Sequence, residues 1–244
     1  MRAIVSTSPG GPETLVLQDR HDPHAGPGEV RIRVAAASVN FPDLLIIEDN
    51  YQYRPERPFS PGAEISGIVD QIGEGVENIA VGTRVLAMVG WGGMAELVVT
   101  PAARVIPIPD AMSFNEAAAL VLTYGTSFHA LADRARLRPG ETLLALRSIA
   151  WQGRFLVVGF PAGIAHLPLN LPLLKGCDVL GVFYGSAVER DPQAYRAGVQ
   201  SLFDHFGRGA IRPHIHAVYP LHEASAALRA LASRATAGKI VVSL

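Results

Sequence analysis

The sequence predicts a mixed α/β fold that combines a β-barrel domain with a smaller region of parallel strands and helices. In the first hundred residues, short runs of alternating apolar and polar side chains are separated by glycine and proline, which is typical of a barrel. Beyond Ser113, helical patterns alternate with two short apolar runs, which is typical of a parallel sheet. With 244 residues, of which 49% are hydrophobic, the chain can bury one large core or two smaller ones.

Charge and cysteine content narrow the class of protein. The net charge is −1 and no basic stripe exists, so no nucleic-acid partner is expected. Cys177 is the single cysteine, which excludes an internal disulfide and a multi-cysteine zinc site. The first residues lack the apolar region of a signal peptide, and no apolar run reaches the length of a membrane span. We therefore expect a cytoplasmic protein without a membrane partner.

Five runs predict the strands of the barrel. The clearest is EVRIRVAAASV (29–39), whose alternation suits a half-buried strand. The other four are 64–73, 83–89, 94–100 and 103–109. GEGVEN (73–78) lacks a third glycine and leads into a strand rather than a helix. We therefore interpret it as a turn between strands and not as a phosphate-binding loop.

Helices and strands alternate in the second half of the chain. Ser113 followed by Glu116 is a capping-box pattern that begins a helix, and a second helical stretch is expected over 126–136. The apolar runs 154–160 and 178–184 predict buried parallel strands. The remaining expected elements are a helix from Pro192 to Gly209, a strand over 214–221, a helix over 222–234 and a strand over 238–244.

The segment GETLLALRSIAWQGRFLVVGF (140–160) looks like part of a dinucleotide-binding fold, but it is too short to hold two parallel strands and the crossover between them. If 143–146 were a strand parallel to the next one, only residues 147–153 would remain for the return. A parallel crossover needs roughly a dozen residues. We therefore interpret 141–151 as one helix, with a glutamate in its first turn and a glycine as its stop, that leads into the strand 154–159.

Seven segments of the sequence carry a resemblance to a known family. They are SVNFPDLLIIEDNYQ (38–52), PFSPGAEISGIVDQIGEGV (58–76), VGTRVLAM (81–88), LTYGTSFHAL (122–131), GRFLVVGF (153–160), LLKGCDVLGVFYGS (173–186) and ASRATAGKIVVSL (232–244). In this order, they resemble the zinc-independent branch of the medium-chain dehydrogenase/reductase family, the zeta-crystallin-like NADPH:quinone oxidoreductases. This resemblance implies a GroES-like catalytic domain formed by 1–123 and 186–244. It also implies a truncated Rossmann remnant, the nucleotide-binding part, over 124–185.

The resemblance further implies hydride transfer from NADPH to a small electrophilic acceptor, either a quinone or an α,β-unsaturated carbonyl. It assigns catalytic roles to Asn40, Tyr51 and Tyr124. It assigns cofactor contacts to Asn40, Thr123, Thr126, Val158, Gly159, Phe160, Phe183 and Tyr184. Asn40 and Ala63 stand where zinc-dependent relatives have a cysteine and a histidine, so no metal site is expected.

Compared with that family, the sequence lacks the glycine-rich turn and helix start that bind the pyrophosphate of the cofactor. At roughly 30 residues per βαβ unit, the loss is on the order of 80 residues. Losing two charge-assisted hydrogen bonds of about 1.5–3 kcal/mol each weakens binding by up to about four decades. We therefore expect weak or absent NADPH binding and no detectable turnover at ordinary cofactor concentrations.

Two hypotheses stay open at this point. The first is an NADPH-dependent reductase impaired by the truncation. The second is a non-catalytic truncated homologue that serves as a dimeric scaffold or binds nucleotide weakly. In both, the remnant sheet holds two strands, and 178–184 is expected to pair with its copy in a homodimer because this would cover an exposed edge.

Some residues receive structural interpretations. His214 and His216 alternate on one strand, near His222, and are expected to be exposed rather than metal ligands. Cys177 is expected to be a small buried residue rather than a nucleophile. Trp91 could flank an acceptor pocket, or it could pack in a hairpin.

Two further groups of residues could suggest acid–base chemistry. Ser127, His129 and Asp133 lie on one short helix without the G-x-S-x-G turn, so a hydrolytic triad is not expected. Asp43 and Glu64 could form an acid/base pair, although a structural salt-bridge role is favoured.

Overall fold

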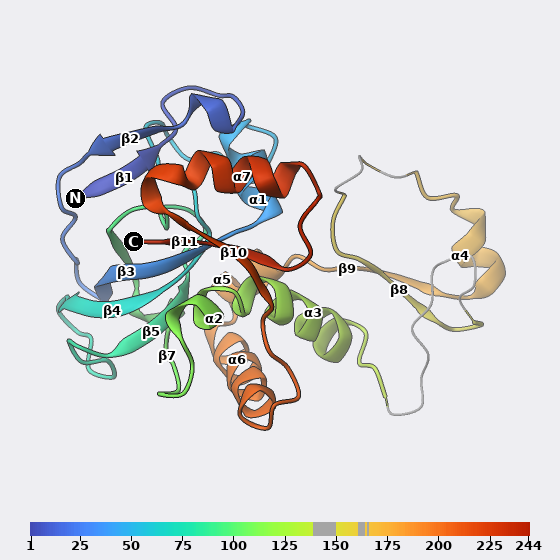
Figure 1. Cartoon of the computed structure of the whole chain (residues 1–244). Coiled ribbons are helices and arrows are strands. Elements are labelled where there is room, and N and C mark those ends of the chain that lie inside the picture. The colour runs from blue at the N-terminus through green and yellow to red at the C-terminus, as the bar shows by residue number, and fades with distance from the viewer. Residues whose placement is uncertain (139–149, 161–163, 165) are drawn as a thin grey trace. The chain divides into compact units, whose positions relative to one another are not determined.

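The computed structural model describes residues 1–138, 150–160, 164 and 166–244 (Figure 1). The chain divides into unit 1, residues 1–122 and 201–244, and unit 2, residues 123–200. The mixed α/β class predicted from the sequence is confirmed. The expected return to the first domain at residue 186 differs from this division, since α5 (Tyr184–Arg190) and the first half of α6 (Pro192–Gly207) belong to unit 2.

Unit 1 contains one seven-stranded sheet in the order β10–β11–β3–β4–β5–β7, with β6 also paired to β3. The strands are β3 (Glu29–Val39), β4 (Glu64–Ile72), β5 (Arg84–Met88), β6 (Leu97–Pro101), β7 (Val105–Pro107), β10 (Ile215–Pro220) and β11 (Lys239–Ser243). β11 is parallel to β10 and antiparallel to β3. The last strand of the chain therefore joins the sheet formed by the first hundred residues.

Two strands and one α-helix of unit 1 were not predicted. β1 (Arg2–Val5) and β2 (Val16–Asp19) form an antiparallel hairpin, and α1 (Phe41–Ile47) follows β3 directly. The first turn of α1 is stabilised by the Asp43 carboxylate, which accepts a hydrogen bond from the Asn40 N–H at 2.7 Å. The helix buries Leu44 and Ile47 in a core that it shares with α7 (Ala224–Ala232).

The interior of the sheet follows the alternation seen in the sequence. Val30, Ile32 and Val34 on β3 are all buried and belong to one hydrophobic cluster. The predicted capping box at the start of α2 (Phe114–Ala118) is confirmed. The Glu116 carboxylate accepts from the Ser113 N–H at 3.0 Å, and the Ser113 hydroxyl accepts from the Glu116 N–H at 3.3 Å.

Unit 2 begins with helical turns and continues with two parallel strands. The chain enters unit 2 within the π-helical turn Val121–Gly125, which is followed by α3 (Thr126–Phe128) and the π-helical turn His129–Arg134. The later helices are α4 (Asn170–Lys175), α5 and the first half of α6. β8 (Arg154–Val157) and β9 (Asp178–Gly181) form the expected two-stranded parallel sheet. No helix in the described part of the chain is both long and apolar enough to cross a membrane.

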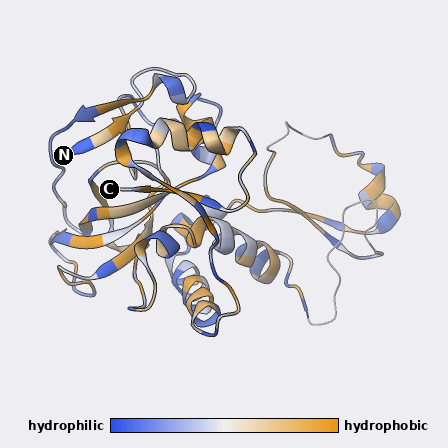
Figure 2. Cartoon of the chain, viewed as in Figure 1, coloured by the Kyte–Doolittle hydropathy of each residue, from blue (hydrophilic) through white to orange (hydrophobic). Residues whose placement is uncertain are grey.

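The expectation that these two strands are buried is wrong. β8 is half-buried along its length, and β9 is mostly exposed, with Val179 at 38%. Figure 2 shows hydrophobic residues along both strands and in α4, where Leu173 is 79% exposed. The apolar pattern of a buried parallel strand is therefore present, but each of these strands has one hydrogen-bonded neighbour in the described residues.

The predicted helix over 141–151 lies almost wholly outside the described residues, which omit 139–149. Ala150 and Trp151, its last two residues, lie in a loop and a turn. The alternative pairing of 143–146 with β8 also falls outside the described part.

Replacing Gly67 by alanine should destabilise unit 1 strongly. A Cβ at Gly67 would lie 2.1 Å from the Arg33 carbonyl oxygen, where β3 and β4 approach closely. The nearest atoms are the carbonyl oxygen and carbon of Arg33, which belong to the backbone. The clash can therefore be relieved only if the two strands move apart, at a cost of about 1–3 kcal/mol or more. Chemical denaturation measures the loss. Gly207→Ala on α6 is the control, because a Cβ there meets nothing within 4 Å, and an equal effect of both changes would contradict the explanation.

Candidate active site

A cluster of polar side chains is buried in unit 1 where β3, β4 and β11 meet the start of α1. Its members, here called the buried polar cluster, are Ser38, Asn40, Asp43, Glu64 and Lys239. The first four are at most 5% exposed, and the Lys239 side chain is 12% exposed. Ser38 pairs with Glu64 across β3 and β4, and Lys239 begins the strand on the other side of β3. The pairing of the sheet therefore sets the positions of these residues.

Asn40 is held at both polar atoms of its side chain. Its Nδ2 donates to the Ser38 hydroxyl at 2.9 Å, and its Oδ1 accepts from Lys239 Nζ at 2.5 Å. Since an ammonium group only donates, the contact with Lys239 also fixes which side of the amide is oxygen. The amide plane of Asn40 is therefore set by two neighbours on different strands.

Glu64 is fully buried and has a partner at each oxygen. Its Oε2 accepts from the Ser38 hydroxyl at 2.6 Å, and its Oε1 accepts from the Leu122 N–H at 2.9 Å. Lys239 Nζ lies 3.6 Å from Oε2. These contacts fit the salt-bridge role favoured for Glu64, because a buried carboxylate needs both a counter-charge and hydrogen bonds.

Asp43 is a carboxyl group that the fold desolvates. It accepts from the Asn40 N–H at 2.7 Å and from the Gly62 N–H at 3.1 Å. Burial raises its pKa to about 7, and the Glu64 charge adds to the rise, while the two N–H groups and Lys239 oppose it. Asp43 can therefore change its protonation near neutral pH, next to the backbone of Asn40.

Aromatic side chains extend from the cluster toward the surface of unit 1. Burial raises the pKa of Tyr51, and the nearby Tyr53 and Asp43 add to this rise. The Tyr51 and Tyr53 ring centroids are 5.8 Å apart, and those of Tyr53 and Trp91 are 6.2 Å apart. Trp91 stays 40% exposed, so it packs against Tyr53 and also presents a face to solvent.

The other predicted site residues belong to unit 2. Thr123 and Tyr124 lie in the first π-helical turn, and Thr126 begins α3. Val158, Gly159 and Phe160 follow β8, and Phe183 follows β9. The Val182 N–H donates to the Val157 carbonyl at 2.9 Å, which places these two strand ends at the same edge. Val158, Phe160 and Phe183 are each more than 40% exposed there.

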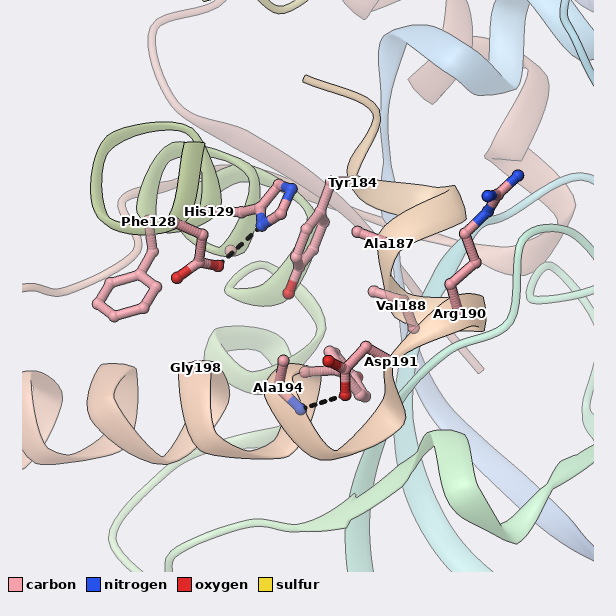
Figure 3. A pocket seen from close by; sticks show the side chains of 12 residues that line it. Phe128, His129, Tyr184, Ala187, Val188, Arg190, Asp191, Ala194 and Gly198 are labelled. Carbon is pink, nitrogen blue, oxygen red and sulfur yellow. Dashed lines mark hydrogen bonds and ion pairs between the residues drawn. The ribbon is translucent and has the colours of Figure 1, made fainter. Parts of the chain in front are cut away.

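Tyr184 lies apart from that edge. Its side chain is 9% exposed and packs beside His129, with the ring centroids 5.7 Å apart (Figure 3). The Tyr195 ring, also in unit 2, lies 6.5 Å from it. A Cβ at Gly125 would lie 2.4 Å from the Tyr184 hydroxyl oxygen, so glycine is required for this packing. The predicted cofactor residues 183 and 184 therefore face different surroundings.

The residues present fit the two ends of a dinucleotide unequally. The exposed apolar side chains at the ends of β8 and β9 suit a flat, uncharged ring, which binds at the carboxyl ends of parallel strands in this type of fold. In the described residues, no G-x-G-x-x-G turn joins a strand to the start of a helix. GEGVEN forms a turn between β4 and β5, as predicted, with Gly75 at φ +79°. Within the described ranges, a diphosphate therefore finds none of its usual backbone partners.

The minor sequence patterns mostly have the structural roles expected for them. His214 and His216 are exposed at and before β10, and Cys177 is 9% exposed. His129 Nδ1 lies 2.8 Å from the Asp133 carboxylate, and Ser127 is exposed. Sequence reasoning missed Ser38 and Lys239. The one local signal for Lys239 is a charge at the start of an otherwise apolar terminal run, GKIVVSL.

Two family models match most of the chain. Residues 26–110 match the alcohol dehydrogenase GroES-like domain, and residues 115–242 match the zinc-binding dehydrogenase model. The quinone oxidoreductase-like protein 2 homolog of Nematostella vectensis is 29% identical over 324 residues, which span 99% of this chain and 88% of the relative.

Two solved structures show the same fold. The human synaptic vesicle membrane protein VAT-1 homolog-like protein has a TM-score of 0.89 and 23% identity, over 100% of this chain and 98% of that chain. The quinone oxidoreductase of Thermus thermophilus, solved alone and in complex with NADPH, has a TM-score of 0.85 and 27% identity, over 100% of both chains.

The length of the sequence match shows an internal difference. The 324 aligned positions exceed the 244 residues of this chain by 80. At least that many positions of the alignment therefore have no counterpart here. This number has the size expected for the loss of between two and three βαβ units of roughly 30 residues.

Replacing Asp43 by asparagine should remove a pH dependence of stability. Because the pKa of Asp43 is raised from 3.8 to about 7, the folded chain holds its proton through a range in which the unfolded chain has lost it. This contribution to stability is complete below pH 4 and is lost as the pH rises through 7. Relative to Asp43→Asn, the unfolding free energy of the natural chain should fall by about 3 kcal/mol between pH 5 and pH 8. Urea titrations at both values measure it, and an unchanged difference would refute the burial argument.

Replacing one partner of the Glu64–Lys239 pair should lower the unfolding free energy more than replacing both. Glu64→Gln or Lys239→Met alone leaves a buried charge without its partner and should cost about 3–5 kcal/mol. The double variant should recover a large part of that loss, which a double-mutant cycle by urea denaturation measures. The exposed pair of Arg2 and Glu96 is the control, because its loss should cost less than about 1 kcal/mol. Additive losses at positions 64 and 239 would count against the pairing.

Proposed function

Since the chain belongs to the medium-chain dehydrogenase/reductase family, in its quinone oxidoreductase-like branch, we propose that it is built to reduce quinones or α,β-unsaturated carbonyls with NADPH. We also propose that it binds this cofactor weakly. The observation that carries the first part is the fixed amide of Asn40 in the buried polar cluster. The observation that carries the second is the absence of a diphosphate-binding turn from the described residues.

At the acceptor end, the residues of unit 1 orient and donate. Asn40 presents an amide that cannot rotate without breaking contacts to Ser38 and Lys239. Tyr51 is a neutral phenol at neutral pH, and burial raises its pKa further above the ordinary value, so its hydroxyl can donate a hydrogen bond to the carbonyl oxygen of the acceptor. Trp91 and Tyr53 provide apolar faces for a flat acceptor. When bound, the nicotinamide supplies the hydride.

At the cofactor end, unit 2 contributes the predicted residues around its strand ends. Val158, Gly159, Phe160 and Phe183 line an exposed edge, and Gly159 has open space where a Cβ would be. Thr123, Thr126 and Tyr124 complete the residues that the family resemblance assigns to the nicotinamide ribose and acceptor. In this proposal, these side chains orient the nicotinamide ring. The diphosphate stays hydrated by solvent instead of accepting hydrogen bonds from a backbone turn.

The exposed edge of β9 gives the homodimer proposal its physical reason. Among the strands that the structure describes, β9 pairs with β8 alone, and its residues Asp178, Val179 and Gly181 are exposed. A strand edge without a neighbour is stabilised when it pairs with a second copy. We propose that the strand expected at 178–184 makes this contact.

Titration with NADPH tests the cofactor part of the proposal. Nicotinamide fluorescence should show no saturation at micromolar NADPH, because losing two phosphate hydrogen bonds weakens binding by up to about four decades. Saturation in that range would overturn the claim of weak binding. Turnover of 9,10-phenanthrenequinone should stay at the buffer background in the same samples.

Restoring the lost segment tests the acceptor part. The aligned segment of the Nematostella vectensis relative, inserted between Leu146 and Arg147, should restore micromolar NADPH binding and NADPH-dependent quinone reduction. A glycine–serine insert of the same length is the control and should restore neither. In the restored chain, Asn40→Ala should lower kcat by roughly tenfold to 100-fold, and it should weaken NADPH binding less than this, because Asn40 is one of several cofactor contacts. A restored chain that binds NADPH without reducing any quinone or enone would refute the proposed activity.

A further inference from the structure

Unit 2 contains a cavity that the proposed reductase activity does not use. It lies between three parts of unit 2: α3 together with the π-helical turn His129–Arg134, α5, and the first half of α6 (Figure 3). Its volume is about 250 Å³. Phe128, Tyr184 and Tyr195 provide aromatic walls. The missing side chain of Gly125 makes room for the Tyr184 ring, and that of Gly198 leaves space beside the Phe128 ring. All lining residues lie between 125 and 198, so the cavity belongs to one unit.

The size and lining of the cavity suit a small aromatic molecule. An engineered cavity of about 150 Å³ accepts benzene, so about 250 Å³ can accept one ring with substituents or two fused rings. Aromatic walls bind aromatic ligands through stacked and edge-on contacts. Helix residues such as Val188 and Tyr195, which are at most 4% exposed, form a packed part of this lining.

One polar group at the cavity selects for a hydroxyl group. His129 lines the cavity, and its Nδ1 lies 2.8 Å from the Asp133 carboxylate (Figure 3). Because a carboxylate only accepts, this contact makes Nδ1 the donor, which leaves Nε2 as an acceptor in the neutral ring. A phenolic O–H on the ligand is the group that such a nitrogen recognises.

The charges at the cavity disfavour an anion. Asp133 and Asp191 each carry a carboxylate, and Arg190 carries the one cation among the lining residues. Asp191 accepts from the Ala194 N–H at 2.9 Å and thereby caps α6, while Arg190 donates to the Ser186 hydroxyl at 3.1 Å. A carboxylate or phosphate ligand would therefore meet a net negative lining.

We propose that this cavity is a binding site for a neutral phenol of one or two rings, held between Phe128 and Tyr184 with its hydroxyl on His129. Its lining includes none of the strand-end residues Val158, Gly159, Phe160 and Phe183, and no member of the buried polar cluster. It gives the chain a ligand-binding activity that does not need the lost segment.

Binding of three matched probes to the full chain tests the proposal. Saturation-transfer NMR titrations use 4-methylphenol, 4-methylanisole, which lacks the hydroxyl donor, and 4-methylbenzoate, which is an anion. The natural chain should bind 4-methylphenol roughly fivefold to tenfold more tightly than 4-methylanisole, as one hydrogen bond provides. It should show no binding of 4-methylbenzoate. Equal affinity for all three, or no transfer to 4-methylphenol, would overturn the proposal.

Two variants locate the binding and one controls for the change itself. Gly198→Leu fills the space in front of the Phe128 ring and should abolish binding of both neutral probes. Gly207→Leu, on the same helix but outside the lining, should leave binding unchanged. His129→Phe should remove the preference for the phenol and keep the affinity for 4-methylanisole. Circular dichroism confirms that each variant is folded, and undiminished binding by folded Gly198→Leu would refute the location.

Discussion

The contact of Lys239 with Asn40 and Glu64 is the interaction on which the rest of unit 1 depends. It joins residues 199 positions apart in the chain and places a charge inside the sheet. A buried lysine is tolerated only with a counter-charge and acceptors, and β3 and β4 supply both. The terminal strand therefore has one register in which its charge is satisfied, and in that register Ile240 and Val242 enter the core.

This constraint explains how the seven-stranded sheet of unit 1 stays intact although the alignment with a relative has 80 more positions than this chain. The partners of β11 are β3 and β10, and α7 packs with α1, so all of these contacts lie within unit 1. Among the described residues of unit 2, β8 and β9 pair only with each other. Its two strands keep the apolar composition of a larger sheet, and Val158 and Leu173 are more than half exposed.

The sequence predicted what depends on local pattern and missed what depends on distant pairing. The alternation over 29–39 and the box formed by Ser113 and Glu116 are short-range signals, and both appear as expected. α1 was missed because Pro42 and a short apolar run fit a loop or strand equally well. The prediction that β8 and β9 are buried was wrong because their apolar composition is typical of strands inside a larger sheet, whereas these two strands are half-buried or exposed. Lys239 was missed because its role exists only once β11 lies beside β3.

The buried polar cluster has a structural role in the sheet and a proposed catalytic role, and Asn40 is the residue at which the two can be distinguished. Glu64 and Lys239 are charged, so changing either one disturbs the packing of β11 against the sheet as well as any chemistry. Asn40 is neutral, and when its side chain is shortened Lys239 still has Glu64 at 3.6 Å as its counter-charge. The loss in stability is then that of hydrogen bonds at the edge of the cluster, about 1–3 kcal/mol. A reductase site and a purely structural cluster therefore differ most at this residue, where activity can fall much further than stability.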